Sequence, residues 1–405
     1  MAPLSPGARM SNVTDGDLAF RAEERWPFYA EDEIEAATAV LRSGKVNQWT
    51  GPDVGDFERA CTERFGGAHG IALANGSLAL DLALLTFEIG PGDEVIVTPR
   101  SFAASAFCVM LSGATPIFAD VDRDSGNMTA GTIERVLTER TRAIIPVHLA
   151  GWPAEMPAIM DLARSRDVLV IEDCAQAHGA TIDGRSVGSF GDAAAWSFCQ
   201  DKIVSTGGEG GFLSFKDPER AEWAWSFKDH GKNPAKIRNS GPPGVFRYVH
   251  DMPGTNWRLT GPQAAIGVAQ LRKLEDWTRL RERNAAIWLR ELKQVGGIRL
   301  PQPPANLRHA LYKLYFYLND SGPGAAQAGN RVVSTALAEG LRVFSGSCSE
   351  IYREAAFEGL PHAQCEVAHE LGDTSLMVEV HPTLDPELLE QRARRLARII
   401  GETLC

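Results

Sequence analysis

The stretch Trp196-Ser197-Phe198-Cys199-Gln200-Asp201-Lys202 lies between an apolar segment and the glycine-rich run Gly207-Gly208-Glu209-Gly210-Gly211. The apolar residues 193–198 predict a buried strand with Ser197 near its end. Lys202 would then follow at the mouth of a cleft, where removal from water favours the free amine, a nucleophile. The glycines allow the backbone to approach a bulky ligand closely. Taken alone, the stretch is better explained by a surface lysine in a flexible loop.

A second apolar run, residues 168–171, ends at Glu172-Asp173. It predicts a buried parallel strand with Asp173 at its carboxyl end, the place where open α/β sheets bind ligands. A buried aspartate is costly without a partner, and a protonated pyridine nitrogen is a suitable one. Pyridoxal 5′-phosphate (PLP) contains such a nitrogen and also reacts with lysine amines. Asp173 and Lys202 together therefore favour a PLP site.

The composition is that of a globular protein, with 405 residues, a net charge of −11 and seven scattered cysteines. The acidic balance argues against nucleic acid or an anionic membrane as the main partner. The cysteines form no CxxC pair, and no His/Cys cluster has metal-ligand spacing, so we expect neither a disulfide framework nor a metal. Neither a signal-peptide pattern nor an apolar run of membrane-spanning length is found. We therefore expect a cytoplasmic protein.

The order of the predicted elements indicates an α/β fold. Short apolar segments alternate with segments of helical spacing from about residue 69 to about residue 215, which predicts a mostly parallel central sheet flanked by helices. Residues 262–295 predict one long helix, and the mixture beyond it predicts a smaller α+β domain. No GxGxxG or GxxxxGK[ST] motif supports a nicotinamide or P-loop site. We divide the chain into an N-terminal tail, a large domain, and a linking helix with a small C-terminal domain: 1–22, 23–262 and 263–405.

Two helix starts carry polar residues of interest. Gly76 and Ser77 open a helical pattern that continues to about residue 87, and amides and hydroxyls at a helix start suit an anion such as phosphate. Taken alone, Ser77 is better explained as an ordinary N-cap. Thr132 is the candidate N-cap of a further helix over residues 133–138.

Four stretches together resemble the DegT/DnrJ/EryC1/StrS sugar aminotransferases, which are PLP enzymes of the aspartate aminotransferase fold (fold type I). The resemblance extends from about residue 29 to the C-terminus. It implies a large domain with a mostly parallel sheet and a smaller C-terminal α+β domain. The stretches that carry it are residues 172–179, residues 188–192, Ser197 with Lys202 five residues later, and residues 258–267.

The resemblance also implies a role for each candidate residue. Lys202 would bind PLP covalently and, once released, move protons as a general acid and base, while Asp173 would keep the pyridine nitrogen protonated. Asn256 would reach across a homodimer interface to the cofactor phosphate of the other subunit, and Arg258 would do the same or bind substrate. The resemblance also implies that the cofactor phosphate is bound by Gly76, Ser77 and Ser197. It implies that Phe102 stacks on the pyridine ring and that Gln176 contacts the phenolic oxygen or the ring face.

Plain structural explanations stand beside several of these roles. Phe102 could be an ordinary core residue, and Gln176 could cap a helix. His148, His178 and His381 are interpreted as hydrogen-bonded structural histidines. Residues 229–252, which contain Arg238, Arg247 and Tyr248, predict a long polar loop near the site or the dimer interface.

The implied reaction transfers an amino group from glutamate or glutamine to PLP, giving pyridoxamine 5′-phosphate (PMP), and from there to a keto sugar carried on a nucleotide diphosphate. Two alternatives remain open: an aminocyclitol-forming transaminase acting on a keto-inositol, and a PLP-binding regulatory protein without turnover. A sugar dehydratase of the same fold is disfavoured, because those proteins replace the lysine with histidine.

The sequence departs from the family pattern in two places. The loop after Lys202 is one glycine longer than usual, and residues 345–350 replace a stretch that contains histidine or tyrosine in many members. In the family, the segment that corresponds to residues 345–350 commonly shapes the substrate pocket. The resemblance is therefore a weaker guide to the substrate than to the cofactor.

Overall fold

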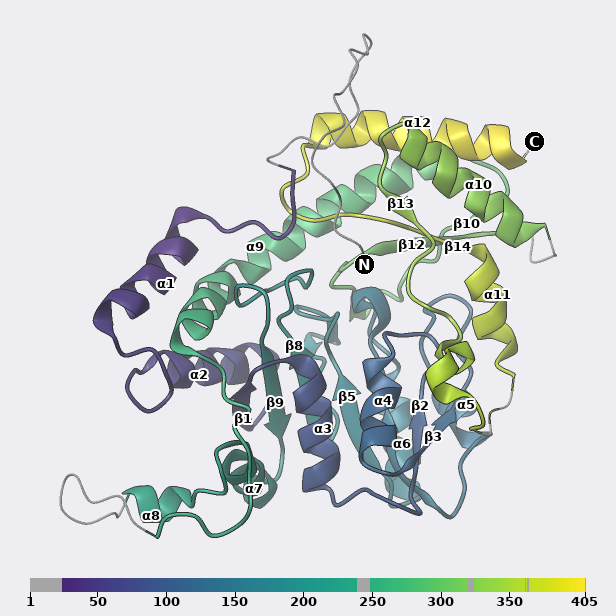
Figure 1. The fold of residues 1–405 in the computed structure, drawn as a ribbon. Coiled ribbons are helices and arrows are strands. Elements are labelled where there is room, and N and C mark those ends of the chain that lie inside the picture. Colours follow the sequence, from purple (N-terminus) through teal and green to yellow (C-terminus); the bar gives the residue numbers. More distant parts are fainter. Residues whose placement is uncertain (1–23, 239–247, 320–323, 361, 363, 405) are drawn as a thin grey trace.

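The computed structural model describes residues 24–238, 248–319, 324–360, 362 and 364–404 (Figure 1). The predicted tail over residues 1–22 and Arg247 lie outside the described residues. None of the six cysteines that the structure describes forms a disulfide bond. Within the same residues, no helix combines the length and apolar character needed to cross a membrane.

A seven-stranded sheet forms the centre of the larger part of the molecule, in the order β1-β9-β8-β5-β4-β2-β3. β9 runs antiparallel to both of its neighbours, and the other adjacent strands are parallel, which confirms the predicted sheet. Asp173 pairs with Ala195, so the carboxyl ends of β5 and β8 meet at one edge of the sheet. The strands are β1 (His69–Leu73), β2 (Glu94–Val97), β3 (Thr115–Phe118), β4 (Thr141–Ile145), β5 (Leu169–Asp173), β8 (Ala193–Ser197) and β9 (Gly211–Phe215).

Helices cover both faces of this sheet because its strands are apolar on both sides. In β2, Ile96 belongs to one core, and its neighbours Val95 and Val97 belong to the other, as the two-residue period of a strand requires. The first core includes side chains of α2 and α6, and the second includes side chains of α3, α4 and α7. The bounds of these helices, and of the short helices α5 and α8, are as follows: α2 (Asp53–Phe65), α3 (Gly76–Thr86), α4 (Ala104–Leu111), α5 (Ala130–Glu134), α6 (Met156–Ser165), α7 (Pro218–Lys228) and α8 (Pro234–Arg238).

The long helix α9 (Gly261–Leu292) connects this part to the C-terminal part (Figure 1). It begins with a capping box between Thr260 and Gln263, and it packs against α1 (Glu31–Ser43), α2 and α12 (Pro386–Leu404). Side chains from its C-terminal end join a third core with α10, α12 and an antiparallel sheet of order β10-β12-β14-β13. This mixture confirms the predicted smaller α+β part.

The remaining elements are short. They are β6 (Thr181–Ile182), β7 (Arg185–Ser186), β10 (Ile298–Arg299), β11 (Leu307–Arg308), β12 (Leu314–Leu318), β13 (Val343–Phe344), β14 (Ser375–Val378), α10 (Ala325–Ala338), α11 (Glu366–Thr374) and three 3-10 turns, Leu149–Gly151, Ile351–Arg353 and Ala355–Phe357.

The predicted N-cap Thr132 was wrong, and the alternative explanation of Ser77 as an N-cap is excluded. The side chain of Asn75, not of Ser77, caps α3 by accepting the Leu78 amide at 3.0 Å. Thr129, not Thr132, caps α5, and Thr132 completes the same capping box from inside the helix. In both cases an earlier residue with a suitable side-chain oxygen occupies the extended conformation that a cap needs.

The segment before α1 ties the C-terminal part to the lysine loop. The carboxylate of Glu24 accepts two hydrogen bonds from Arg392 of α12, at 2.6 and 2.7 Å, and the two residues are 2% and 0% exposed. Two residues later, the indole of Trp26 donates to the backbone carbonyl of Lys202 at 2.8 Å. A buried bidentate pair therefore anchors a segment that contacts the loop carrying Lys202.

We predict that Arg392→Met destabilises the protein strongly, because it leaves the buried Glu24 carboxylate without its charge partner. Breaking a buried pair in this way costs about 3–5 kcal/mol of unfolding free energy. Urea unfolding of the variant measures this loss, with Arg394→Met as the control, since Arg394 lies on the same helix with its side chain 61% exposed. The double variant Glu24→Gln/Arg392→Met should be more stable than Arg392→Met alone. Equal stability of Arg392→Met and the wild-type protein would contradict the prediction.

Candidate functional site

A cavity of about 590 Å³ lies at the edge of the sheet where β5 and β8 end. Its volume falls in the range of small-molecule sites. Seven of the eight predicted cofactor residues line it, and Asn256 of the same chain does not. The seven are Gly76, Ser77, Phe102, Asp173, Gln176, Ser197 and Lys202.

Asp173 is the last residue of β5 and is only 6% exposed. One carboxylate oxygen, Oδ2, accepts a hydrogen bond from the Ser105 hydroxyl at 2.7 Å, and the other, Oδ1, accepts the Ala175 amide at 3.1 Å. Ser105 lies on α4, and its oxygen is 3.1 Å from the Ser101 hydroxyl. Two donors thus orient a buried carboxylate at the wall of the cavity.

Lys202 lies in the loop that follows β8, and its side chain is only 15% exposed. Its Nζ is 3.6 Å from Oδ1 of Asp201 and 5.2 Å from the centre of the Tyr312 ring. The structure therefore excludes the surface position that the local sequence favours. The lysine and Asp173 line the same cavity.

The N-terminus of α3 forms one end of the cavity. The first amides of a helix have no partner within the helix, and the Asn75 cap takes only that of Leu78, so the amides of Gly76 and Ser77 remain available to an anion. A Cβ atom on Gly76 would lie 2.6 Å from Cβ of Ser197, so only glycine permits this close approach. Backbone amides and the hydroxyls of Ser77 and Ser197 therefore gather where a phosphate would fit.

Phe102 and Gln176 form further parts of the wall. Phe102 is 72% exposed, which excludes the alternative of an ordinary core residue and leaves its ring free to stack on a ligand. The side-chain oxygen of Gln176 accepts the Ala150 amide at 2.6 Å. The side-chain NH₂ group of Gln176 is therefore available to donate a hydrogen bond to a ligand.

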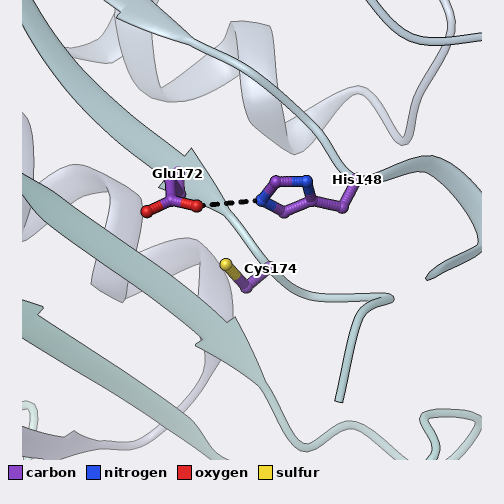
Figure 2. Close-up of side chains that lie close together, drawn as sticks. All are labelled: His148, Glu172 and Cys174. Carbon is purple, nitrogen blue, oxygen red and sulfur yellow. Dashed lines mark hydrogen bonds and ion pairs between the residues drawn. The ribbon is translucent and has the colours of Figure 1, made fainter. Parts of the chain in front are cut away.

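Outside the lining of the cavity, His148, Glu172 and Cys174 bring three possible metal-binding atoms within 4.8 Å of one another (Figure 2). The Glu172 oxygens accept the amides of Gly188, Phe190 and Gly191 at 2.7–2.8 Å and Nε2–H of His148 at 3.1 Å. Because Nδ1 of His148 accepts the Ala154 amide at 3.0 Å, both of its ring nitrogens are also in use.

The protonation of this cluster also fits a hydrogen-bonded network better than a metal centre. Burial alone would raise the pKa of Glu172, but the His148 hydrogen bond and the backbone amides outweigh it and lower that pKa. Burial, with the nearby carboxylates of Glu172 and Asp173, raises the pKa of the Cys174 thiol well above its usual value, which disfavours the thiolate that binds metals. The network fixes β5 one residue before Asp173.

His178 is structural but not hydrogen-bonded, so that part of the prediction was wrong. Its ring is fully buried against Phe65, Trp196 and Phe198, and among the described residues neither ring nitrogen has a hydrogen-bond partner. Burial lowers its pKa to about 3, and the charges of Lys202 and Arg281 add to this effect. The imidazole is therefore neutral at physiological pH.

Other residues that the sequence analysis placed near the cofactor or substrate do not line this cavity. Arg258 forms an ion pair with the buried Asp229, and Tyr248 is 88% exposed. In the part of the chain that the structure describes, none of residues 345–350 lines the cavity. Ser349 instead accepts a hydrogen bond from the buried Arg100.

Sequence reasoning missed four residues: Ser101, Ser105, Asp201 and Tyr312. Ser101 and Ser105 follow the predicted strand before α4, but nothing local connects them to Asp173. Tyr312 comes from the C-terminal part, and its hydroxyl donates to Asp201, the residue before the predicted lysine. An acidic residue directly before the predicted lysine could have indicated Asp201 from the sequence, whereas Tyr312 could be found only from the fold.

Comparison with known proteins agrees with this architecture. The model of the DegT/DnrJ/EryC1/StrS aminotransferase family matches residues 27–396. The chain is 39% identical over 346 residues to UDP-N-acetyl-3-dehydro-alpha-D-glucosamine 3-aminotransferase of Acidithiobacillus ferrooxidans, covering 84% of this chain and 85% of that protein. It is 38% identical over 288 residues to GDP-perosamine synthase of Caulobacter vibrioides, covering 71% and 74%.

Among solved structures, an aminotransferase from Psychrobacter cryohalolentis superimposes with a TM-score of 0.90 at 42% identity, covering 94% of this chain and 99% of that one. The family match spans most of the chain, and the similarity to these proteins extends over both its larger and its smaller part. The chain therefore belongs to the DegT/DnrJ/EryC1/StrS aminotransferase family.

Proposed function

We propose that this aminotransferase uses PLP, alternating with PMP, to transfer an amino group from glutamate or glutamine to a keto sugar linked to a nucleotide diphosphate. One observation carries the proposal: Lys202 and the oriented carboxylate of Asp173 line one cavity with the amide-rich start of α3. A reactive amine, a fixed anion and a phosphate-binding helix end are the three groups that PLP requires.

The residues fit the cofactor in a definite arrangement. Asp173 would face the pyridine nitrogen, the start of α3 with Ser77 and Ser197 would bind the phosphate, and Phe102 and Gln176 would contact the ring. PLP, when bound, supplies the electron sink that makes the substrate C–H bond acidic. Asp173 stabilises the protonated nitrogen that this sink needs. Lys202 attaches the cofactor and, after release, carries the proton at its Nζ as general base and acid.

The substrate class is supported by the names of the relatives, which describe enzymes of UDP-linked and GDP-linked amino sugars. No contact in the described residues favours a keto-inositol over a nucleotide-linked sugar. A purely regulatory role is disfavoured, because a protein without turnover has no need to keep both Lys202 and the donors that orient Asp173. Cysteines outside disulfide bonds suit a cytoplasmic enzyme.

We also propose that the chain divides into a large domain over 23–262 and, over 263–405, a linking helix followed by a small C-terminal domain. The boundary coincides with the start of α9 at Gly261. Residues near the C-terminal end of α9 belong to the core of the smaller part, whereas Ala264 and Leu274 belong to a core of the larger part. The helix therefore acts as the connection between the two.

We further propose a homodimer in which Asn256 completes the partner subunit's phosphate site. The backbone of Asn256 pairs with Asp229, and its position is exposed and outside the cavity of its own chain. Trp257 packs against Phe227, so it needs no partner itself. Trp49 and Trp223 are 39% and 37% exposed, and exposed tryptophans are typical of protein interfaces.

The proposed activity is tested with purified protein in its PMP form, mixed separately with UDP-, GDP- and dTDP-linked keto sugars and with a keto-inositol. We expect an aminated nucleotide sugar in the mass spectrum, together with return of the visible absorbance of lysine-bound PLP. Lys202→Ala serves as the control and should show neither. Amination of the keto-inositol alone would favour the aminocyclitol alternative, and no amination of any substrate would contradict the proposal.

The shared site is tested by mixing Lys202→Ala with Asn256→Ala, each first measured alone to establish that it is inactive, under conditions that exchange subunits. Each mixed dimer would contain one intact site and one site with both defects, so the mixture should regain part of the activity. A mixture of Lys202→Ala with Asp173→Asn is the matched control. It should show no such recovery, because both changes lie on the same chain's side of the site and neither mixed site is intact. A light-scattering mass of a monomer, or no recovery in confirmed mixed dimers, would contradict the shared site.

A further inference from the structure

Two side chains with no role in the proposed cofactor contacts enclose the Nζ atom of Lys202. Oδ1 of Asp201 lies 3.6 Å from it, and the Tyr312 ring lies beneath it at 5.2 Å. The Tyr312 hydroxyl donates a hydrogen bond to the other oxygen of Asp201, Oδ2. The three side chains therefore form a closed unit in which each contacts the other two.

The unit joins distant parts of the chain. Asp201 and Lys202 belong to the loop after β8, whereas Tyr312 precedes β12 in the C-terminal part. The backbone at Leu311 and Tyr312 is also fixed by hydrogen bonds, because the buried Arg281 of α9 donates to their two carbonyl oxygens at 3.1 and 3.4 Å. Since Trp26 holds the Lys202 carbonyl, the loop and the tyrosine are both fixed by contacts from outside the unit.

Two members of this unit, Tyr312 and Asp201, have pKa values shifted by their contacts. Burial, together with the charge and hydrogen bond of Asp201, raises the pKa of Tyr312, so its hydroxyl keeps the proton that it donates. Burial alone would raise the pKa of Asp201, but Lys202 and the Tyr312 hydrogen bond outweigh it and lower that pKa. Asp201 is therefore an anion at neutral pH.

We propose that Asp201 is a positioning residue that stabilises positive charge on Nζ of Lys202, and that Tyr312 holds the Asp201 carboxylate in the orientation this requires. The proposal rests on the proposed role of Lys202 as the cofactor lysine. A nearby anion favours the protonated form of a nitrogen, and a ring face beneath it acts in the same direction. In the holoenzyme, the pair would favour the protonated form of the nitrogen that links Lys202 to PLP.

Other charged and titratable groups near Lys202 do not replace Asp201. Glu209 and Cys199 line the same cavity and contact each other at 3.8 Å, and Asp173 is held by Ser105. The groups around the unit are Asp173 on β5, Cys199 and Glu209 on the lysine loop, His178 after β5, Arg281 on α9, and Lys313 beside Tyr312. Of these, Arg281 and Lys313 are cations and oppose the effect of Asp201.

The test follows the visible absorbance of PLP bound to Lys202 in the holoenzyme as the pH is changed, because this absorbance reports whether the linking nitrogen is protonated. Asp201→Asn preserves shape and removes the charge. The Asp201 side chain is 52% exposed, so we expect solvent screening to limit the effect, with a midpoint lower by about 1 pH unit. The difference between the two proteins should shrink at high salt.

Tyr312→Phe is the second variant, because it keeps the ring beneath Nζ and removes only the hydroxyl. It should lower the midpoint in the same direction by a smaller amount. Glu209→Gln is the matched control, since it removes a carboxylate from the same cavity without a contact to Lys202, and its midpoint should stay near that of the wild-type protein.

The outcomes separate this inference from the proposed function. An Asp201→Asn midpoint equal to or above the wild-type midpoint would overturn the role of Asp201, even though lysine-bound PLP would still support the function. A Glu209→Gln shift as large as that of Asp201→Asn would overturn it as well, since the effect would then be general to the cavity. Borohydride reduction that labels a lysine other than Lys202 would overturn both.

Discussion

The carboxylate of Asp173 is held at the end of β5 by the Ser105 hydroxyl and the Ala175 amide, in a position that is only 6% exposed. A charge in such a place is costly unless it is hydrogen-bonded and faces a positive partner. The strand that carries it is fixed just before this point, because Glu172 is anchored by His148 and three backbone amides. The rest of the site is arranged around this fixed anion.

The neighbouring strands place the other groups relative to Asp173. β8 runs parallel to β5 with Ala195 opposite Asp173, so Ser197 and then Lys202 follow at the same edge of the sheet. β9 returns antiparallel and brings Gly211 against the start of α3, where a Cβ atom would lie 2.1 Å from the Asn75 carbonyl oxygen. The glycines after the lysine therefore allow the phosphate-binding end of α3 to lie against the strands that carry the other reactive groups.

The parts of this arrangement that the sequence predicted are local. Apolar runs predicted the strands. Asp173 at the end of one run and Lys202 after another predicted the carboxylate and the amine of one PLP site. The helix caps were predicted less well, because Asn75 and Thr129 compete with other polar residues within one turn. Ser105 could not be predicted as a partner, since it lies 68 residues before Asp173 and only the folded arrangement of α4 over the sheet brings the two side chains together. The buried, unpaired His178 depends likewise on an aromatic environment that no short motif encodes.

The central claim is that Asp173 keeps the cofactor nitrogen protonated. The direct measurement is the ¹⁵N chemical shift of PLP labelled at its pyridine nitrogen and bound to the protein. The account predicts the shift of a protonated nitrogen in the wild-type holoenzyme at neutral pH, and that of an unprotonated nitrogen in Asp173→Asn. An unprotonated nitrogen in the wild-type protein, or a protonated one that persists in Asp173→Asn, would contradict it.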